Sequence, residues 1–531
     1  MNHANLILRN ARIFTVDDNQ PWAQSVACGQ GRILAVGSDG HVQSWEGKDT
    51  EVIDLDGKLV LPGFIDSHVH LLQYACQRQQ VCLFGVRTIE EVRRRLQQAA
   101  AKTPPGAWIL GWGWDELHWD AAPHRGLLDD ITPRNPVALK RMDLHTWWVN
   151  GAAMAQAGIT ANTPNPPESA IERDAGGEPT GVLREWNAIA LVESHIPTPT
   201  PEEQCEWLRQ TIHEAHQLGI TSVHDQRVKN EGDVSFRLFQ HLLQRDELQL
   251  RIHMNIAAES LDSAARLGLR PGFGGDRLWI GHVKAFADGS MGSRTALMLD
   301  PYENQPNNRG VEVLSPAQLD GMAAKAARAG FPLSIHAIGD RAVRQVIDAY
   351  ANAGQTTTTA PHRIEHVQTI HPSDLPRLGQ LGIVAAVQPV HLVTDWQTAD
   401  MVWGARARRA YSFRSLLRHG ITMAFGSDAP VAPWNPLLGI HAAITRQDEE
   451  GMPDEGWYAA ERLTLADAVR AYTLGSARAA GRQSCQGSVT PGKWADLIAL
   501  SHDLFTHPTD AIRETKVLLT LFDGQIVHNR L

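Results

Sequence analysis

Eight short apolar runs rich in β-branched residues recur along the middle of this chain, and amphipathic helical stretches separate them. The runs are Leu59–His70, Gly219–Asp225, Leu248–Ala257, Leu278–Ala287, Phe331–Ala337, His362–Val367, Ile383–Pro389 and Ile421–Ser427. The intervening stretches at residues 316–329 and 341–353 show the helical pattern most clearly. Repeated strand–helix units set parallel strands side by side through right-handed crossovers. Eight such units predict an α/β fold built on a (β/α)8 TIM barrel.

An open, doubly wound parallel sheet is the alternative architecture for alternating strands and helices. That fold would carry a glycine-rich phosphate-binding loop after its first strand. No such loop follows the first apolar run of this chain. The barrel is therefore the favoured prediction.

Both ends of the chain have the pattern of short strands joined by tight turns. Asp56-Gly57 and Asp523-Gly524 are typical hairpin turns between apolar stretches. Each terminal piece alone would leave an apolar face uncovered. We expect residues 1–60 and 485–531 to form one small β-sandwich domain, with the barrel at residues 61–484.

The first and second apolar runs lie too far apart for a single crossover connection. We expect an inserted, tryptophan-rich subdomain at residues 76–205. Tryptophan fills the cores of small domains, and it also lines sites for apolar ligands. Residues 111–116 and 143–150 are candidate lid loops over the barrel mouth. The candidate substrate contacts on the second loop are His145, Trp148 and Asn150.

Composition limits the classes of partner. Lys and Arg number 49 against 59 Asp and Glu, a net charge of −10, which argues against nucleic acid. No stretch reaches the roughly 18 uninterrupted apolar residues of a membrane helix, and the N-terminus has no secretory signal pattern. The five cysteines are scattered without a CxxC pair, as expected in a reducing compartment. We expect a cytoplasmic protein that acts on a small molecule, without a membrane partner, and a homodimer on general grounds.

Polar residues at the ends of the predicted barrel strands form a candidate metal site. Active sites of such barrels lie at the carboxyl ends of the strands. The first run ends in His68 and His70, and residues two apart in a strand share one face. An HxH pair alone is weak, because it also fits two polar residues where a strand leaves the core. Four further residues lie at or near the ends of later runs, namely Lys284, His336, His366 and Asp428.

Each of these residues has an alternative role. His336 also fits a hydrogen-bonded core histidine, Lys284 can pair with Asp288, and Asp428 can cap a turn. Their joint placement at strand ends favours the metal site. Four histidines and one aspartate suit Zn²⁺, and also Fe²⁺, Mn²⁺ or Ni²⁺. With that set complete, His224 receives no ligand role.

Six segments of the chain carry a family resemblance. They are Leu61–His70, Val283–Ala296, His336–Asp340, Arg363–Val367, Gly426–Val431 and Pro491–Leu497. Together they resemble the amidohydrolase superfamily of metal-dependent hydrolases, and in particular its YtcJ-like group (amidohydrolase family 3), which includes the N-substituted formamide deformylases. The resemblance covers essentially the whole chain.

The resemblance implies a role for each candidate ligand. His68 and His70 would bind the more buried metal ion together with Asp428. His336 and His366 would bind a second ion. Zn²⁺ is the expected metal, with one or two ions in the site.

Lys284 would bridge the two ions. A protonated lysine cannot ligate a cation. In this superfamily the corresponding lysine is often N6-carboxylated, which makes it an anionic carbamate. An unmodified Lys284 beside a single ion remains the alternative.

The implied activity is hydrolysis of a non-peptide C–N bond of the amide or formamide type by metal-activated hydroxide. A bound metal lowers the pKa of water from about 15.7 to about 7. Asp428 would be the general base, and His336 would polarise the scissile carbonyl if only one metal is bound. Asp288 and Arg294, on the loop after the fourth run, would line the substrate site.

Two other functions compete with this one. The same site can hydrolyse an ester, a lactone or an organophosphate, because activated water does not discriminate between these bonds. A regulatory relative without turnover is the second alternative. The complete ligand set, with Asp428 present, argues against it.

Overall fold

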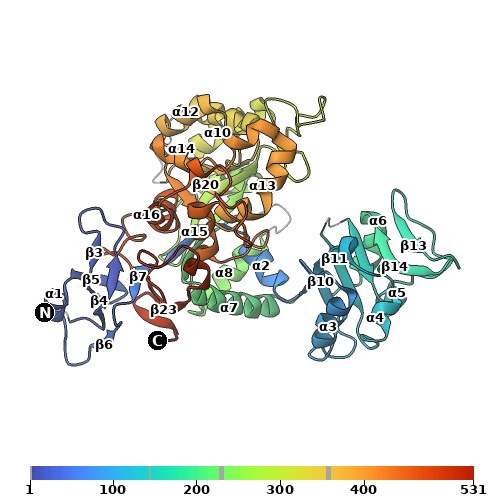
Figure 1. Ribbon diagram of the computed structural model, residues 1–531, viewed down its shortest axis with the longest axis horizontal. Helices are drawn as coiled ribbons and strands as arrows, with labels where there is room; N and C mark the ends of the chain where they lie inside the picture. Colours follow the sequence, from blue (N-terminus) through green and yellow to red (C-terminus); the bar gives the residue numbers. More distant parts are fainter. Residues whose placement is uncertain (1–2, 143–144, 227–232, 355–359) are drawn as a thin grey trace. The chain divides into compact units, whose positions relative to one another are not determined.

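The computed structural model describes residues 3–142, 145–226, 233–354 and 360–531. The chain divides into two compact units (Figure 1). The first contains residues 1–71 and 209–531, and the second contains residues 72–208. Each unit has its own sheets and its own core.

Eight parallel strands form the central sheet of the first unit, in the order β21-β20-β19-β18-β17-β16-β15-β8. The strands are β8 (Phe64–Val69), β15 (Ile220–Asp225), β16 (Arg251–Ala257), β17 (Leu278–Phe286), β18 (Leu333–Ala337), β19 (Arg363–His366), β20 (Val384–Val387) and β21 (Met423–Phe425). The predicted α/β barrel is confirmed, and its strands fall within the eight apolar runs.

The first apolar run divides into two strands at Gly63. β7 (Leu59–Pro62) pairs with strands of the terminal sheet, whereas β8 begins the barrel. A Cβ atom at Gly63 would lie 2.3 Å from Thr221 Oγ1, so the close approach of β15 requires glycine here.

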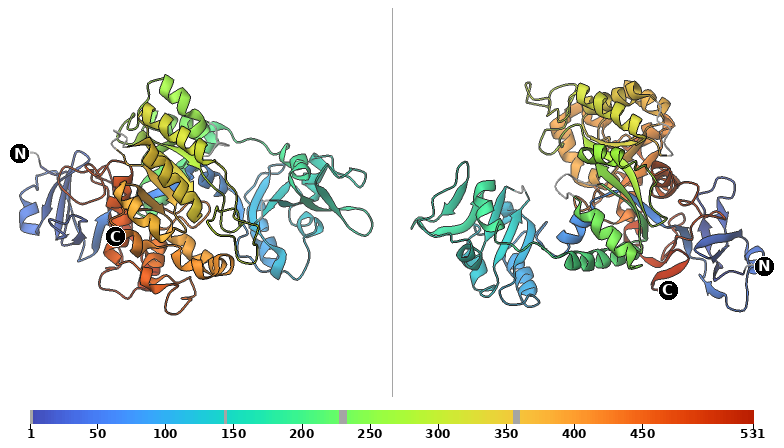
Figure 2. Two further views of the ribbon diagram at one scale, coloured as in Figure 1. Left: turned by 90° about the horizontal axis from the view of Figure 1, so that it is seen from above. Right: turned by 180° about the vertical axis from the view of Figure 1, so that it is seen from behind.

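Helices connect the barrel strands and surround them (Figures 1 and 2). α10 begins with a capping box between Ser315 and Gln318 and has Pro316 in its first turn, and it ends at Gly330 with φ of +71°. The barrel helices of six or more residues are α7 (Pro201–Gln217), α8 (Val234–Gln244), α9 (Leu261–Arg266), α10 (Pro316–Ala329), α11 (Asp340–Ala353), α12 (Leu375–Gln380), α13 (Pro389–Trp403), α14 (Phe413–Arg418), α15 (Pro436–Thr445) and α16 (Leu465–Arg470).

Backbone hydrogen bonds between the first and last strands bring the barrel close to closure. Asp428 N donates to His68 O at 2.7 Å, and His70 N donates to Ala429 O at 2.9 Å. The Asp66 carboxylate accepts hydrogen bonds from the amide and hydroxyl of Ser427 and from the amide of His68. The two ends of the barrel sheet therefore meet where the candidate ligands lie.

Strands from both ends of the chain share one six-stranded sheet, in the order β24-β23-β22-β7-β2-β3. Its strands are β2 (Arg12–Phe14), β3 (Trp22–Ala23), β7, β22 (Leu497–Leu500), β23 (Val517–Phe522) and β24 (Gln525–Asn529). A second sheet has the order β5-β4-β1-β6 and contains β1 (Leu6–Arg9), β4 (Ser25–Gly29), β5 (Arg32–Gly37) and β6 (Glu51–Asp54).

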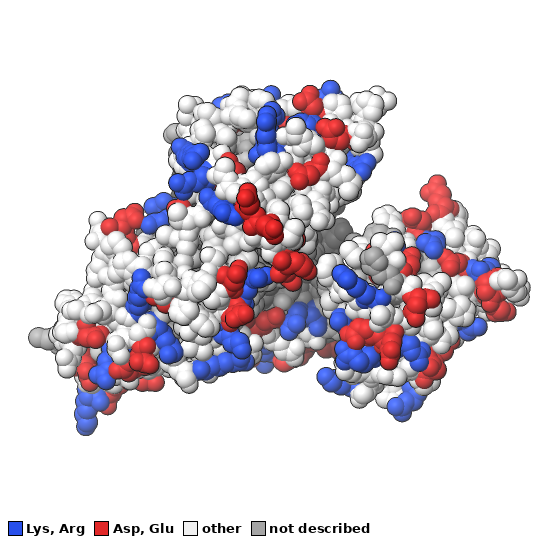
Figure 3. Space-filling model, in the orientation of Figure 1, with Lys and Arg blue, Asp and Glu red and all other residues white. Residues whose placement is uncertain are grey.

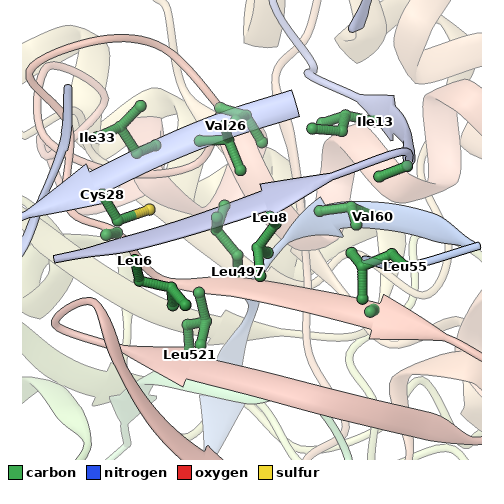
Figure 4. Packing of buried hydrophobic residues seen from close by; sticks show 14 of the residues in the cluster. Leu6, Leu8, Ile13, Val26, Cys28, Ile33, Leu55, Val60, Leu497 and Leu521 are labelled. Carbon is green, nitrogen blue, oxygen red and sulfur yellow. The ribbon is translucent and has the colours of Figure 1, made fainter. Parts of the chain in front are cut away.

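One apolar core joins these two sheets. Leu8 and Val26 from the four-stranded sheet pack in the same cluster as Val60, Leu497 and Leu521 from the six-stranded sheet (Figure 4). All five side chains are at most 1% exposed. The N-terminal and C-terminal segments thus bury each other's apolar faces.

The second unit contains a six-stranded sheet in the order β13-β14-β12-β11-β10-β9. Its strands are β9 (Val81–Cys82), β10 (Ile109–Trp114), β11 (Val137–Arg141), β12 (Thr146–Val149), β13 (Ala170–Arg173) and β14 (Pro179–Arg184). Its helices include α3 (Ile89–Ala100), α4 (Gly126–Asp129), α5 (Gly151–Gln156) and α6 (Trp186–Glu193). Trp114 and Trp148 lie in the core on one face of this sheet, and Trp147 lies in the core on the other.

Acidic and basic side chains are interspersed on the face shown in Figure 3, on both units. Within the described part of the chain, no helix has the length and apolarity that a membrane span requires.

A buried arginine links the amino-terminal end of the barrel to the terminal sheet. Arg251 on β16 is fully buried and donates to Asp496 Oδ2 at 2.6 Å and to Asp523. Its guanidinium lies 3.9 Å from the Trp494 ring centroid. Both ends of the ion pair are therefore desolvated and mutually satisfied.

Replacing this arginine should destabilise the first unit strongly. Arg251→Ala leaves Asp496 buried without its cation, so we expect the free energy of unfolding to fall by about 3–5 kcal/mol in urea denaturation. Lys325→Ala, which removes an exposed ion pair with Asp262, should change it by less than about 1 kcal/mol. Equal effects of the two substitutions would show that the buried pair is not important for stability.

Candidate metal centre

The predicted ligands gather at the carboxyl end of the barrel. His68 lies near the end of β8 and His70 directly follows that strand. His366 is the last residue of β19, and its ring centroid lies 4.8 Å from that of His68 and 4.5 Å from that of His336 on β18. Asp428 follows β21. The structure therefore brings together histidines and an aspartate that the chain separates widely.

Asp428 faces the first-strand histidines. Its Oδ1 lies 3.3 Å from Nε2 of His68 and 3.3 Å from Nε2 of His70. All three side chains are buried, and their ligand atoms lie within 4.8 Å of one another. This spacing allows the three residues to bind one ion, as the resemblance implied for the more buried metal.

The other oxygen of Asp428 faces a histidine outside the predicted set. Nε2 of His391, on the first turn of α13, lies 3.7 Å from Asp428 Oδ2. His366, His391 and Asp428 form a second group with ligand atoms within 4.8 Å of one another. Asp428 thus lies between two groups of histidines and contributes one oxygen to each.

Three candidate histidines have one ring nitrogen facing an oxygen acceptor. Such an acceptor holds the proton on the nearer nitrogen and leaves the lone pair of the other nitrogen for a metal. The pairs are His68 Nδ1 with Glu365 Oε2 at 2.5 Å, His366 Nδ1 with Gln388 Oε1 at 2.8 Å and His336 Nε2 with Gly289 O at 3.0 Å. The nitrogens left for a metal are Nε2 of His68 and His366 and Nδ1 of His336.

Burial keeps these histidines neutral. It lowers the pKa of His68 and of His336 to about 4 and lowers the pKa of His366 well below its usual value. Burial opposes ionisation of Asp428, but the facing histidines hold the pKa of that carboxyl well below its ordinary value. At neutral pH His68, His336 and His366 therefore present imidazole lone pairs and Asp428 presents a carboxylate, which is the ligand form. Burial opposes protonation of His70, but its contact with Asp428 raises the pKa of that ring above its ordinary value.

Lys284 on β17 is buried against the Phe286 ring, whose centroid lies 4.8 Å from Nζ. Burial lowers the pKa of Lys284 to about 8. The neutral amine is the form that reacts with CO₂, so burial favours the chemistry that a bridging carbamate requires.

Three buried polar atoms at the centre have no hydrogen-bond partner among the described residues. They are Lys284 Nζ, His70 Nδ1 and His391 Nε2. Buried polar atoms are costly unless a partner satisfies them. Imidazole nitrogens and a carboxylate are the ligands that Zn²⁺ and similar ions accept, so the residues present fit a divalent metal.

Two residues of the centre have a left-handed backbone. His366 has φ of +73° and Asp428 has φ of +62°. Non-glycine residues occupy this region rarely, mostly in turns, and the strained ones cluster at functional sites. The strand alternation ends at these positions, so each side chain turns toward the centre.

Asp288, a predicted substrate contact, has both carboxylate oxygens engaged by the backbone. They accept hydrogen bonds from the amides of Leu297, Ile338 and Gly339 at 2.8–3.0 Å. Asp288 therefore ties its own loop to the loop after β18. Arg294 lies on the same loop with φ of +55° and is half-buried. A substrate role for these residues stays a prediction.

The remaining predicted contacts lie in the second unit. His145 is exposed, and its Nδ1 lies 2.9 Å from Glu185 Oε2. Trp148 is fully buried in the core. Asn150 caps α5 by accepting from Ala153 N, and it also accepts from Val137 N. These bonds and contacts all lie within the unit's own fold, and a substrate role for any of the three stays untested.

His391 was absent from the predicted site because it lies beyond the end of its strand, on the helix that follows. The signal in the chain was Gln388-Pro389-Val390-His391, in which proline starts a helix directly after the seventh strand. His224, which receives no ligand role in the prediction, has its Nδ1 2.8 Å from Arg363 Nη1.

Comparisons with known proteins show the family of the chain. The model of the amidohydrolase family matches residues 51–528. The chain is 37% identical to "Protein LONG AFTER FAR-RED 3" of Arabidopsis thaliana, over 94% of this chain and 87% of that protein. It is 30% identical to "Putative amidohydrolase YtcJ" of Bacillus subtilis, over 98% of each. It is 29% identical to "N-substituted formamide deformylase" of Arthrobacter pascens, over 99% of this chain and 98% of that protein.

A solved structure is similar along nearly its whole length. It is an uncharacterized metal-dependent hydrolase from Pyrococcus furiosus, with a TM-score of 0.76 and 28% sequence identity. The match covers 94% of this chain and 99% of that one.

A methyl group at Gly426 should disturb the centre. A Cβ atom there would lie 2.5 Å from His68 N, 2.8 Å from His68 Cβ and 2.9 Å from Asp66 Oδ1. We expect Gly426→Ala to weaken metal binding by about 10-fold or more, because ligand position is set by its supporting contacts. Competition with a chromophoric chelator measures the affinity.

Gly321→Ala is the matched control. Gly321 lies in α10, where an added Cβ meets nothing within 4 Å. That variant should keep wild-type metal affinity and gain up to about 1 kcal/mol of stability. Wild-type metal affinity in Gly426→Ala would show that the strand contact does not position His68.

Proposed function

This chain belongs to the amidohydrolase family, and we propose that it is a zinc-dependent enzyme that hydrolyses a non-peptide C–N bond of an amide or formamide. The observation that supports this most is the position of Asp428. It is a buried carboxylate at the barrel mouth, between His68 and His70 on one side and His366 and His391 on the other.

His68, His70 and Asp428 would hold the first ion, His336 and His366 would hold the second, and a carboxylated Lys284 would be a ligand to both. A bound metal supplies water with a pKa lowered to about 7 and polarises a carbonyl. The residues themselves orient the reactants, since every candidate ligand except the partly buried His336 is buried in the barrel.

Asp428 is the proposed general base. Its oxygens lie 3.3 Å from His68 and His70 and 3.7 Å from His391, so the carboxylate faces histidines that would hold a metal and would be within reach of a water activated there. Taking a proton from that water and passing it to the leaving nitrogen completes the hydrolysis. A leaving amine needs this proton because an amide anion is a poor leaving group.

His336 is the proposed residue on the carbonyl side. Its Nε2 is held by Gly289 O, which fixes the ring and turns Nδ1 away from that carbonyl. It would hold the second ion beside the scissile carbonyl, or contact the carbonyl itself if one ion is bound.

One relative supports the proposed bond class. A relative named for deformylation of N-substituted formamides aligns with nearly the whole chain. Esters and lactones present the same carbonyl to the same water, so a substrate series has to distinguish them.

The test is a screen of the Zn²⁺-loaded chain against N-substituted formamides, amides, lactones and esters. We expect turnover of formamides or amides, loss of that turnover after chelation and recovery with added Zn²⁺. Asp428→Asn should lower kcat by about 10²–10⁴-fold, because an amide cannot accept the proton. Bound metal is quantified in each variant.

Asp320→Asn is the matched control, since this acid lies on the exposed face of α10 and should leave kcat unchanged. Wild-type turnover by metal-loaded Asp428→Asn would rule out Asp428 as the base. Turnover of esters alone would rule out the proposed C–N bond class.

The state of Lys284 decides between one ion and two. Incubation with ¹³C-bicarbonate should produce a carbamate carbon signal in the NMR spectrum of the wild-type chain. Lys284→Met should remove that signal and lower the bound metal from two ions to one. A wild-type chain that holds two ions without a carbamate signal would contradict carboxylation.

A further inference from the structure

We propose that Glu365, held by Arg363 and Ser334, is a positioning residue for the metal centre and fixes His68 as a ligand through Nε2. Glu365 immediately precedes His366 on β19 and is not one of the ligands named above. This inference rests on the metal centre of the proposed function.

The contact between Glu365 and His68 sets the tautomer of the ring. Oε2 of Glu365 lies 2.5 Å from His68 Nδ1, and both side chains are at most 1% exposed. A carboxylate only accepts, so the proton stays on Nδ1. The lone pair is then on Nε2, the nitrogen that lies 3.3 Å from Asp428.

Glu365 is in turn held by donors on both oxygens. Arg363 Nε lies 2.5 Å from Oε1, and Arg363 Nη2 lies 3.0 Å from Oε2. Ser334 Oγ donates to Oε1 at 2.7 Å. Two donors on one plane and a third from β18 leave the carboxylate a single orientation.

Arg363 connects this carboxylate to the strand that bears the ligand. Its Nη2 donates to Ser67 O at 2.6 Å, one residue before His68. Its Nη1 lies 2.8 Å from His224 Nδ1 on β15. The guanidinium therefore fixes the backbone of β8 and the side chain of Glu365 at once, and its charge balances the buried carboxylate.

The backbone at His366 makes this arrangement possible. Consecutive residues of a regular strand point to opposite faces. With φ of +73° at His366, the alternation ends, and both side chains lie on the side of His68. Glu365 Oε2 lies 2.5 Å from His68 Nδ1, and the ring centroids of His366 and His68 lie 4.8 Å apart.

A purely structural ion pair is the competing explanation. It predicts a loss of stability in variants of Glu365 without a change in metal affinity. A positioning role predicts weaker metal binding in every variant that folds, because an unheld ring is free to rotate and to change tautomer. Metal affinity, measured without substrate, separates the two.

The experiment uses the full-length apo chain titrated with Zn²⁺ in competition with a chromophoric chelator. Glu365→Gln keeps the shape of the side chain and replaces one acceptor oxygen by a donor. We expect it to bind Zn²⁺ about 10–100-fold more weakly, and to change the visible absorption spectrum of the Co²⁺-loaded chain. Ser334→Ala, which removes one donor to Glu365, should weaken binding less.

Arg251→Ala is the control, since it breaks a buried ion pair at the first residue of β16, at the amino-terminal end of the barrel and not at the carboxyl end where the ligands lie. It should lower stability while Zn²⁺ affinity stays at the wild-type value. Wild-type affinity and spectrum in Glu365→Gln would overturn the proposal. If that variant does not fold, wild-type affinity in Ser334→Ala overturns it instead. A chain without activity on any C–N bond would overturn the proposed function, but the affinity comparison would still stand.

Discussion

The whole site depends on the hydrogen bonds that join the first and last barrel strands. His68 accepts from the amide of Asp428, and Asp66 accepts from Ser427. The residues that bring the barrel toward closure are thus the candidate ligands themselves or their direct neighbours. Parallel strands so distant in sequence meet only when every intervening strand–helix unit is in place. The centre therefore cannot form from one local segment, and its ligands come together only when the whole barrel has folded.

The interior near the centre is polar, and three of its histidines have a partner on one ring nitrogen. Glu365, Gln388 and the carbonyl of Gly289 each hold one histidine nitrogen. Burying such partners has an unfavourable desolvation free energy, but their hydrogen bonds fix the orientation of the groups they bind. The atoms without partners cluster where an ion would lie, as at Lys284 Nζ. A rigid shell around a small set of unsatisfied atoms is the form expected of a preorganised site.

Much of the fold was predictable because strand–helix alternation is a strong periodic signal, and the eight runs locate all eight barrel strands. The division of the first run at Gly63 was less visible, since apolar character continues across it. In the site, strand-end histidines were found by position alone, whereas His391 was missed because a helix turn presents it. Local pattern also said little about Trp148 and Asn150, whose observed contacts are core packing and helix capping within the second unit. For Asn150 there was one usable signal, because an asparagine directly before a helix is a typical N-cap residue.

The spread of the ligands over the barrel strands has a consequence for the stability of the folded protein and its resistance to proteolysis. An ion shared by β8 and the segment after β21, and a second one shared by β18 and β19, would act as cross-links that exist only in the folded chain. Such binding adds about 2.7 kcal/mol of stability when free metal is about 100 times the Kd. Metal supply would then set the fraction of molecules open to proteolysis as well as the fraction able to react. Abundance and activity of this protein would rise and fall together with the metal available to it.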